Sequence, residues 1–502
     1  MDEQTPTAAP FPPTVGILED LLPHLTAWMA AQRWYAAKST GPAETAVVGS
    51  AVIAEDDAQQ VIDVVVRAGS GERATDYQVP LHVSRPATEP AASGDADPAM
   101  SGHAGPDGDA AEDAPVADAD AAAEIAVLAV RGGPLRVADA TRTDEGRRAL
   151  LALLDDERGA RGAGLVIRGN GGRAEASAPE GTPAAGRIVS SRLLSGEQSN
   201  SSMIFELEGS APVIAKLFRV LQAGENPDVV VQGALDAAGS AQVAPMHGAA
   251  EIVWGEGGRA LTGHALFAQE FFPGVEDAWR VALRDAVAGT DFTDGARSLG
   301  EATASVHRDL AEHLGVTAPD DAERERMVAS MLARLDASRA EVPEVDAVGE
   351  ALAGVLRRAL DVPWPPFQRI HGDYHLGQVL AVPGRGWVLL DFEGEPMRPL
   401  ADRALPDCPV RDIAGMLRSL DYVAGAVRLD SGGDATAWAQ DARDAFLAGY
   451  ADVAGISTDD AAFTTLLAAF EADKAAYEAL YEARNRPDWL PIPLGSLERL
   501  AR

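Results

Sequence analysis

The chain has 502 residues, too many for one hydrophobic core, because single cores stop growing at about 250–300 residues. Its 77 Asp and Glu residues outnumber 42 Lys and Arg, and the net charge of −35 opposes binding to nucleic-acid backbones and anionic membranes. The single Cys408 excludes an intrachain disulfide, and the acidic, proline-rich N-terminus without an apolar run of ~18 residues predicts a cytoplasmic protein.

The N-terminal region has the patterns of helix followed by sheet. Apolar residues recur every three to four positions from 14 to 36, which predicts a pair of short amphipathic helices interrupted at Pro23. Apolar or alternating runs at 46–53, 61–66 and 77–83 predict a small sheet.

The composition changes abruptly at residues 85–122, which consist almost entirely of Ala, Asp, Gly, Pro, Ser and Glu. Such a segment buries too little apolar surface to offset its ordering entropy, so we expect a disordered acidic insertion. A strand at 124–130 and a helix at 143–155 follow, and a second flexible stretch at 170–185 ends this N-terminal region.

The next segment has the element order of a small sheet lobe with one helix after its third strand. The expected elements are strands at 187–194, 202–206 and 213–218, a helix at 228–238, and strands at 250–254 and 265–271. From residue 290 the patterns are largely helical, interrupted by a strand–loop–strand block at 369–391.

That block carries the strongest chemical signal in the chain. The segment QRIHGDYHLGQVL (368–380) precedes GWVLLDFEGEP (386–396), in which an apolar strand ends in Asp391. One carboxylate, Asp373, can accept a proton from an attacking hydroxyl, while Asp391 can hold the Mg²⁺ that neutralises nucleotide phosphates. Gln378 supplies a neutral oxygen ligand. An HGD tripeptide alone is weak evidence, and an Asp after a strand more often caps a turn, but the combination at this spacing favours phosphoryl transfer.

These motifs resemble those of aminoglycoside phosphotransferase-like kinases, on His371–Gln378 and Asp391–Pro396. Further segments narrow the resemblance to maltokinases: Trp28–Lys38, Arg398–Leu400, Asp407, Arg411–Ser419 and Asn485–Trp489. The resemblance implies transfer of the γ-phosphoryl group of ATP to the anomeric hydroxyl of maltose, giving maltose 1-phosphate for glycogen and α-glucan synthesis. It implies Asp373 as the catalytic base, Gln378 and Asp391 as Mg²⁺ ligands, and His371 as a residue that shapes the substrate pocket.

Upstream residues are predicted to bind the nucleotide. A polar loop between two strands can bring backbone N–H groups to phosphate oxygens, although alone it reads as a hairpin turn. Lys216 lies in the apolar strand VIAKLF, where an unpaired ammonium group would be costly. Binding to nucleotide phosphates would remove this cost, and so would a position at the sheet edge that faces solvent. Gln269 and Phe271 end a strand just before Pro273-Gly274. This position is typical of a hinge between two lobes, where backbone groups can bind adenine. The alternative interpretation is an ordinary strand end. The loop candidates are Ser195, Gly196, Gln198, Ser199 and Asn200.

One position departs from the maltokinase pattern. Such chains tend to carry a glutamate shortly after an Asn-Pro-Asp turn to orient the strand lysine, but this chain has Asn226-Pro227-Asp228 followed by three valines. Glu225 or Asp228 are the candidate substitutes.

A helix predicted at 470–484 carries further substrate candidates. Tyr477 and Tyr481 lie on one face of this predicted helix, and Glu478 and Glu482 lie on the adjacent face. Tyrosines suit the apolar faces and hydroxyl edges of a disaccharide, and the two glutamates could instead bind an ammonium group. The alternative interpretation is that the tyrosines are core residues and the glutamates are solvated.

The sequence thus predicts an α+β, protein-kinase-like bilobal fold with an N-terminal α/β cap domain. The expected ranges are 1–185 for the cap, 186–275 for a small antiparallel-sheet lobe and 276–502 for a large helical lobe. The leading function is an ATP- and Mg²⁺-dependent maltokinase that is a monomer or weak oligomer, with a trehalose synthase partner left open. The alternatives are a glucosamine kinase and a non-catalytic pseudokinase.

Overall fold

The structure is a computed structural model that describes residues 11–35, 44–71, 74–86, 123–131, 133–155, 159–171, 187–194, 199–255, 259–395 and 398–502. The chain divides into two compact units. The first unit comprises residues 1–223 and 247–271, and the second comprises residues 224–246 and 272–502. None of the helices in the described ranges has an apolar stretch long enough for a membrane span.

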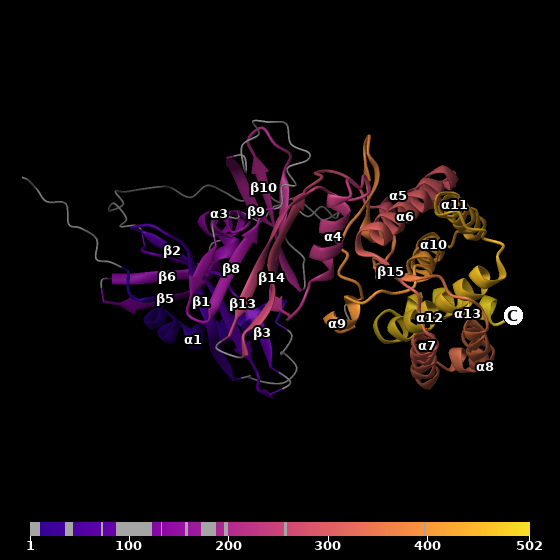
Figure 1. Cartoon of the computed structure of the whole chain (residues 1–502), viewed down its shortest axis with the longest axis horizontal. Coiled ribbons are helices and arrows are strands. Elements are labelled where there is room, and N and C mark those ends of the chain that lie inside the picture. Colours follow the sequence, from indigo (N-terminus) through magenta and orange to yellow (C-terminus); the bar gives the residue numbers. More distant parts are fainter. Residues whose placement is uncertain are drawn as a thin grey trace, which may run out of the picture. The chain divides into compact units, whose positions relative to one another are not determined.

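The first unit is built on two seven-stranded sheets (Figure 1). In one sheet the strand order is β12-β3-β2-β4-β6-β5, with β1 paired to β2. Its strands are β1 (Thr45–Glu55), β2 (Gln59–Ala68), β3 (Thr75–Gln78), β4 (Leu81–Ser84), β5 (Glu124–Val130), β6 (Gly133–Asp139) and β12 (Val220–Leu221).

The other sheet has the order β7-β8-β13-β14-β11-β10-β9. Its strands are β7 (Ala160–Gly162), β8 (Leu165–Asn170), β9 (Ile188–Leu193), β10 (Asn200–Leu207), β11 (Val213–Phe218), β13 (Met246–Trp254) and β14 (Leu261–Glu270). In β11, Val213, Ala215 and Leu217 are buried, whereas Ile214 and Lys216 are half-buried. The period-two pattern therefore sends Lys216 to the face opposite the core.

The helix pair expected at 14–36 is instead one helix, α1 (Thr14–Ala31), which continues through Pro23. A proline inside a helix costs about 3 kcal/mol, because it removes an N–H donor and crowds the preceding turn. Leu18, Leu21, Leu25 and Met29 are all buried on one stripe of α1. Burying a side chain of this size contributes about 1.5–3 kcal/mol, so the stripe outweighs the proline.

Most other predicted elements of the first unit appear within a few residues of their expected ends. The run at 77–83 is two strands rather than one, β3 and β4, separated at Val79-Pro80, where proline offers no N–H to a ladder. Strands β6, β7, β8 and β12 were not expected. Helix α3 (Asp144–Ala152) begins after Thr143, whose hydroxyl accepts the Gly146 N–H at 3.2 Å. The expected acidic insertion falls largely on residues 87–122 and the second flexible stretch on 172–186, both outside the described residues.

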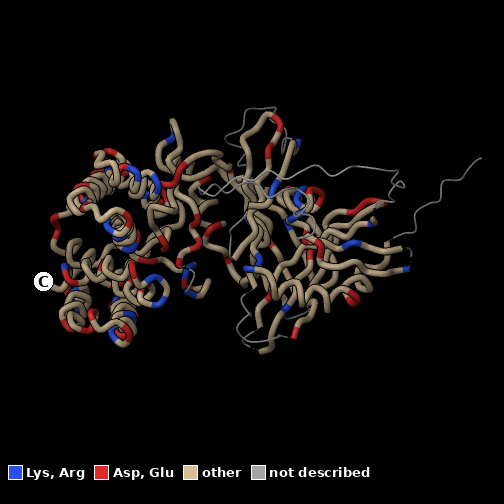
Figure 2. The backbone as a smooth tube through the Cα atoms, turned by 180° about the vertical axis from the view of Figure 1, so that it is seen from behind, with Lys and Arg blue, Asp and Glu red and all other residues tan. Residues whose placement is uncertain are grey.

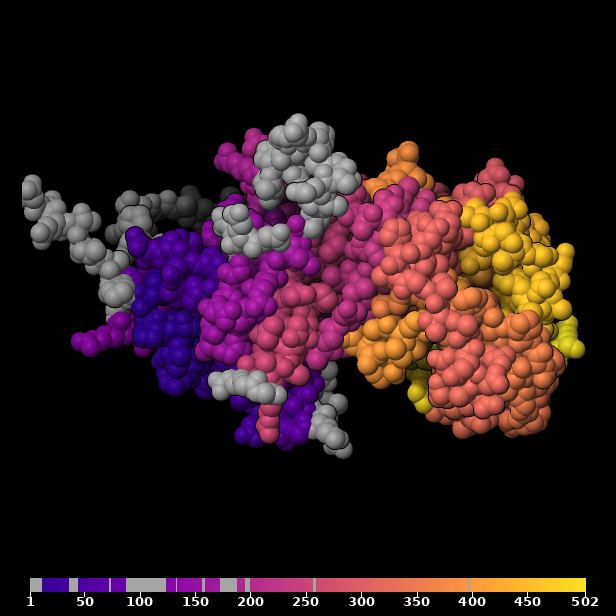
Figure 3. Space-filling model, viewed as in Figure 1, coloured from indigo at the N-terminus to yellow at the C-terminus, as the bar shows by residue number. Residues whose placement is uncertain are grey.

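The second unit is predominantly helical (Figure 1). Its longer helices are α4 (Pro227–Ala237), α5 (Ala278–Ala288), α6 (Thr293–Leu314), α7 (Asp321–Glu341), α8 (Pro343–Arg358), α10 (Val410–Ser431), α11 (Thr436–Ala454), α12 (Ala461–Asn485) and α13 (Pro491–Leu500). In Figure 3 the yellow C-terminal residues pack against the orange residues of the same unit, in agreement with contacts of α12 and α13 with α8. The α+β class, with a strand-rich first unit and a helical second unit, is confirmed. The domain limits at 185 and 275 stay predictions.

Helices α6 and α11 approach each other closely because each has a glycine at the contact. A Cβ atom on Gly300 would lie 2.0 Å from the carbonyl oxygen of Phe446, and one on Gly449 would lie 2.1 Å from that of Arg297. Any larger residue at either position would push the two helices apart.

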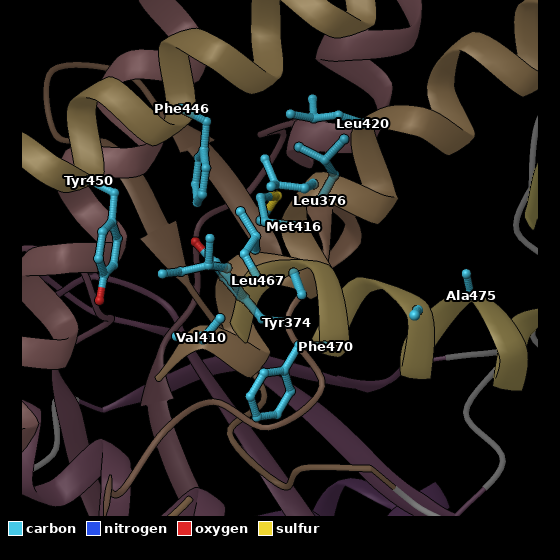
Figure 4. Close-up of a cluster of buried hydrophobic side chains, with 14 of the residues drawn as sticks. Tyr374, Leu376, Val410, Met416, Leu420, Phe446, Tyr450, Leu467, Phe470 and Ala475 are labelled. Carbon is cyan, nitrogen blue, oxygen red and sulfur yellow. The ribbon is translucent and has the colours of Figure 1, made fainter. Parts of the chain in front are cut away.

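The core of the second unit reaches the loop that carries Asp373 (Figure 4). Side chains of α10, α11 and α12 converge on Tyr374 and Leu376, which are 2% and 0% exposed. The Tyr374 hydroxyl also lies 2.8 Å from Thr303 Oγ1 of α6. Because Tyr374 and Leu376 are held in a packed core, the helical unit fixes the backbone that directly follows Asp373.

A polar cluster is buried within the first unit between the two sheets. Arg219, 1% exposed, donates to Asp139 Oδ2 at 2.7 Å and to Ser201 Oγ at 2.8 Å. Nearby, Asp63 on β2 is fully buried and accepts one hydrogen bond from Gln78 Nε2 at 2.6 Å. The other oxygen of Asp63 has no partner among the described residues. Burial therefore raises the pKa of Asp63 to about 7, although Gln78 and Arg219 lower it in part.

This carboxyl group predicts a pH dependence of stability. The folded state keeps the proton on Asp63 up to about pH 7, whereas the unfolded chain releases it near its ordinary pKa of 3.8. The free energy of unfolding should therefore fall as pH rises from about 4 to about 7, by at most about 4 kcal/mol. Asp63→Asn removes this dependence, so the stability of the variant relative to the unchanged protein should increase from pH 5 to pH 8. Denaturant unfolding at both pH values tests this, with exposed Asp57→Asn as control. Identical pH slopes for Asp63→Asn and the unchanged protein would contradict the assignment.

Candidate active site

Two short strands place the metal-ligand candidates side by side. Strand β17 (Val379–Val382) pairs antiparallel with β18 (Gly386–Leu389), with Val379 opposite Leu389. The Leu390 N–H donates to the Gln378 carbonyl at 2.9 Å, which extends the pairing by one residue at each strand end. As a result Gln378 Nε2 lies 3.0 Å from Asp391 Oδ2. The structure therefore brings together Gln378 and Asp391, and their role as metal ligands stays a prediction.

Asp391 has a strained backbone that its neighbours hold in place. Its φ of 64° makes it the one non-glycine residue with positive φ in the described part of the chain. On one side, the Leu390 carbonyl accepts from His371 Nε2 at 2.9 Å, and on the other the Phe392 N–H donates to Asp228 Oδ1 at 2.9 Å. These bonds tie the Asp391 loop to the Asp373 loop and to the first turn of α4.

The carboxylates around Asp391 suit a divalent cation. Ligand oxygens of Asp228, Asp391 and Glu393 all lie within 4.8 Å of one another. Three carboxylates so close repel one another unless a cation neutralises them, and carboxylate and amide oxygens are the ligands that Mg²⁺ prefers. The donor set, with the adjacent Gln378 amide, therefore fits Mg²⁺.

Asp412, at the start of α10, positions the loop that carries Asp373. It is 1% exposed and accepts the backbone N–H groups of His371 at 2.8 Å and Gly372 at 2.9 Å. His307 Nε2 donates to it at 3.0 Å. Burial would raise the pKa of Asp412, but these bonds and the histidines lower it below its ordinary value. The carboxylate thus remains ionised and holds the two residues before Asp373.

Asp373 itself forms an ion pair with a residue from a distant helix. Lys474 Nζ of α12 lies 3.2 Å from Asp373 Oδ1 and 3.5 Å from Glu395 Oε1. The side chains of Asp373 and Lys474 are 26% and 23% exposed, so both still reach solvent. Because Glu395 belongs to the segment that begins at Asp391, Lys474 links this segment to the Asp373 loop.

A cavity of about 190 Å³ opens beside this ion pair. Its lining residues are Arg334, Gly372, Tyr374, Glu395, Arg398, Arg411, Gly415, Phe470, Asp473, Lys474 and Tyr477. The charged groups around it are paired: Arg334 with Asp473 at 2.7 Å, and Arg411 and Arg398 with Asp407 at 2.9 and 3.1 Å. A cavity lined by polar donors, acceptors and aromatic rings, and close to the Asp373 carboxylate, suits a polyhydroxylated acceptor. His371 lines a smaller neighbouring cavity.

The structure separates the four substrate candidates predicted on α12. Tyr477 lines the cavity, and its ring stacks with Tyr481 at a centroid distance of 6.5 Å. Tyr481 is 45% exposed and does not line the cavity. Glu478 accepts from Arg418 at 2.8 Å, and Glu482 accepts from Arg486 at 2.6 Å and from the Tyr422 hydroxyl. Both glutamates thus pair with arginines and neither lines the cavity.

The predicted nucleotide residues lie in the first unit. Ser195, Gly196 and Gln198 are outside the described residues, whereas Ser199 and Asn200 lead into β10. In the ladders, Lys216 pairs with Ser202 of β10 and with Phe267 of β14. Gln269 pairs with Ile214, and the Phe271 N–H donates to the Pro212 carbonyl at 2.7 Å. Asn200, Lys216 and Gln269 therefore lie on three adjacent strands.

Sequence reasoning gave no role to Lys474, Asp412 or the cavity arginines. Lys474 had a usable signal, since it is a lone lysine in the small-residue segment AAFEADKAAYEAL. A cation in such a segment is expected to have a buried partner. Arg334 carried no such signal, because its partner Asp473 lies 139 residues away.

Two protein families match this chain. Residues 28–119 match the family described as Maltokinase N-terminal cap domain, and residues 191–463, more than half of the chain, match the Phosphotransferase enzyme family. These matches confirm the resemblance inferred from the motifs.

Curated relatives and solved structures give further similarity. Glucosamine kinase of Streptacidiphilus jiangxiensis is 31% identical over 249 residues, covering 46% of this chain and 56% of that protein. Glucosamine kinase of Mycolicibacterium smegmatis is 27% identical over 254 residues, covering 46% and 61%. The matched part thus spans less than two thirds of either relative. A structure of glucosamine kinase in complex with glucosamine, ADP and inorganic phosphate aligns with a TM-score of 0.63 at 21% identity, covering 95% of this chain and 98% of that one. The likeness establishes the kinase-like fold with its cap.

Proposed function

Because the chain belongs to the Phosphotransferase enzyme family, we propose that it transfers the γ-phosphoryl group of ATP to a sugar hydroxyl, with maltose as the acceptor and its anomeric hydroxyl as the site. The observation that carries the proposal is the position of Asp373 beside a cavity lined by charged and aromatic side chains, in a loop joined to the Gln378–Asp391 pair. A base, a metal-ligand set and an acceptor cavity are the parts that phosphoryl transfer requires.

In this proposal Asp373 accepts the proton of the attacking hydroxyl. The sugar oxygen forms a bond to the γ-phosphorus as the bond to the β,γ-bridging oxygen breaks, and ADP leaves. Gln378 and Asp391 would hold Mg²⁺, with Asp228 and Glu393 close by, and the bound metal supplies charge neutralisation to the phosphates. Lys216 and the loop at 195–200 bind the phosphates, and Gln269 and Phe271 meet the adenine. Asp412 keeps the backbone before Asp373 in place.

Maltose is favoured over an amino sugar by the ion pairs of the two glutamates on α12. Glu478 and Glu482, which would have bound an ammonium group, pair with Arg418 and Arg486 instead. The cap match points the same way, since its family is described as a maltokinase domain. The product, maltose 1-phosphate, would then feed α-glucan synthesis.

Glucosamine is the second candidate acceptor, because both curated relatives are glucosamine kinases. A pseudokinase is disfavoured, since Asp373, Gln378 and Asp391 are all retained at positions suited to catalysis.

Measuring ADP release with maltose, glucose and glucosamine, each at millimolar concentration with ATP and Mg²⁺, tests the proposal. We expect the highest kcat/KM with maltose. A higher kcat/KM with glucosamine would favour the glucosamine kinase over the maltokinase. ATP binding without transfer to any of the three sugars would support the pseudokinase.

A further inference from the structure

Lys474 occupies a position from which its side chain can contact the acceptor. Its ammonium group lies within 3.5 Å of two carboxylates, Asp373 and Glu395, and 6.0 Å from the centre of the Tyr477 ring. Lys474, Glu395 and Tyr477 all line the cavity beside the proposed base. Any hydroxyl that reaches Asp373 must therefore also approach Lys474.

The acids of the cavity are all matched by cations. Lys474 is shared by Asp373 and Glu395, and Arg334 donates to Asp473 from Nε and Nη2, each at 2.7 Å. Arg411 lies 3.8 Å from the same Asp473 carboxylate. Within the described lining residues, no carboxylate is left without a cation, so an incoming ammonium group would meet positive charge already in place.

The charge on Lys474 persists at neutral pH. Burial lowers the pKa of the ammonium group, but Asp373, Glu395 and Glu478 outweigh burial and raise the pKa above its ordinary value. A lysine has three N–H donors and no acceptor, so it can donate to an acceptor oxygen while it keeps a carboxylate contact.

We propose that Lys474 determines acceptor specificity: its ammonium group donates a hydrogen bond to an oxygen of a neutral sugar beside Asp373 and repels sugars that carry an ammonium group. This inference rests on the proposed function for the presence of a sugar acceptor, but it does not require that the sugar be maltose. Rejection arises because an ammonium at this position would face a like charge in a partly desolvated cavity.

The test compares glucose and glucosamine as acceptors for two variants, Lys474→Met and Lys474→Arg. The two sugars differ in one group, a hydroxyl in glucose and an ammonium group in glucosamine. Methionine keeps the apolar length of the stem without the charge, and arginine keeps the charge. We expect the kcat/KM ratio of glucosamine to glucose to rise at least about tenfold in Lys474→Met and to remain within about threefold in Lys474→Arg. Arg428→Met, at an exposed position near the end of α10, is the matched control and should leave the ratio unchanged.

Thermal unfolding shows whether Lys474→Met is folded, and binding of both sugars in the presence of ADP, measured by calorimetry, gives the same ratio without turnover. A ratio unchanged in Lys474→Met, or shifted toward glucose, would overturn the inference. Absence of maltose turnover in the unchanged protein together with a shifted binding ratio would overturn the maltose assignment alone. Binding of neither sugar by any variant would overturn both.

Discussion

Asp373→Asn is expected to lower kcat by at least about 10²-fold, the usual contribution of a general base, while the affinity for ADP changes less than about threefold. The substitution keeps the shape of the side chain but removes the carboxylate that we propose as the acceptor of the sugar's proton. It also leaves Lys474 with Glu395, so the second partner of the lysine is retained. Single-turnover measurement of transfer, with ADP binding measured separately, distinguishes lost chemistry from lost binding.

The control for this variant is Asp430→Asn, an exposed acid near the end of α10. It changes the same functional group outside the site and should leave kcat unchanged. A near-normal rate for Asp373→Asn would show that another group accepts the proton. An equal loss of ADP affinity would show instead that the variant disturbs the nucleotide site or the fold.

Asp391→Asn is expected to lower kcat/KM by at least about 10²-fold, because several kcal/mol of charge stabilisation depend on the metal that this carboxylate would hold. Asparagine tolerates the left-handed backbone at this position about as well as aspartate does, whereas alanine would add strain. The variant should therefore fold and require more Mg²⁺ for half-maximal activity.

The measurement is a titration of initial rate against Mg²⁺ concentration for Asp391→Asn and for Asp361→Asn, which changes an exposed acid after α8. We expect Asp391→Asn to raise the half-saturation concentration of Mg²⁺ and Asp361→Asn to leave it unchanged. A lower rate with an unchanged Mg²⁺ requirement would assign Asp391 a structural role only.

The parts of the site that lie close together in the sequence could be predicted from it. The Asp373 loop and the Asp391 segment lie on either side of one hairpin, β17–β18, so their spacing already implied that Gln378 and Asp391 meet. Strand β11 and its half-buried Lys216 followed from an alternating apolar pattern within six residues. In both cases the residues that form the local sequence pattern are the same residues that make the contact in the structure.

The residues that could not be assigned depend on contacts between distant segments. Helical periodicity places Glu478 and Glu482 on one face of α12, but it does not say that Arg418, 60 residues earlier, already binds Glu478. Figure 2 shows basic and acidic positions interspersed along the helices of the second unit, which allows many such pairings. Pro23 was misread for the same reason, since the burial that keeps α1 continuous comes from the sheet it packs against and from its own apolar stripe.

The structure assigns α12 a larger role than its sequence suggested. Asp473 of this helix holds Arg334 of α7, Glu471 accepts from Arg443 of α11 at 2.7 Å, and Lys474 reaches Asp373. The ion pairs of Glu471 and Asp473 fix the helical turn that precedes Lys474, so the ammonium group is presented to the cavity from a rigid element. Positioning of this kind is what makes a side chain useful for discriminating acceptors.

The most direct test of the proposed reaction is the position of phosphate on the product. The protein is incubated with ATP, Mg²⁺ and maltose, and the product is examined by phosphorus–proton correlated NMR. We predict a phosphorus signal coupled to the anomeric proton of the disaccharide, absent when Asp373→Asn replaces the unchanged protein. Coupling to any other sugar proton, or release of inorganic phosphate alone, would contradict phosphorylation at the anomeric hydroxyl.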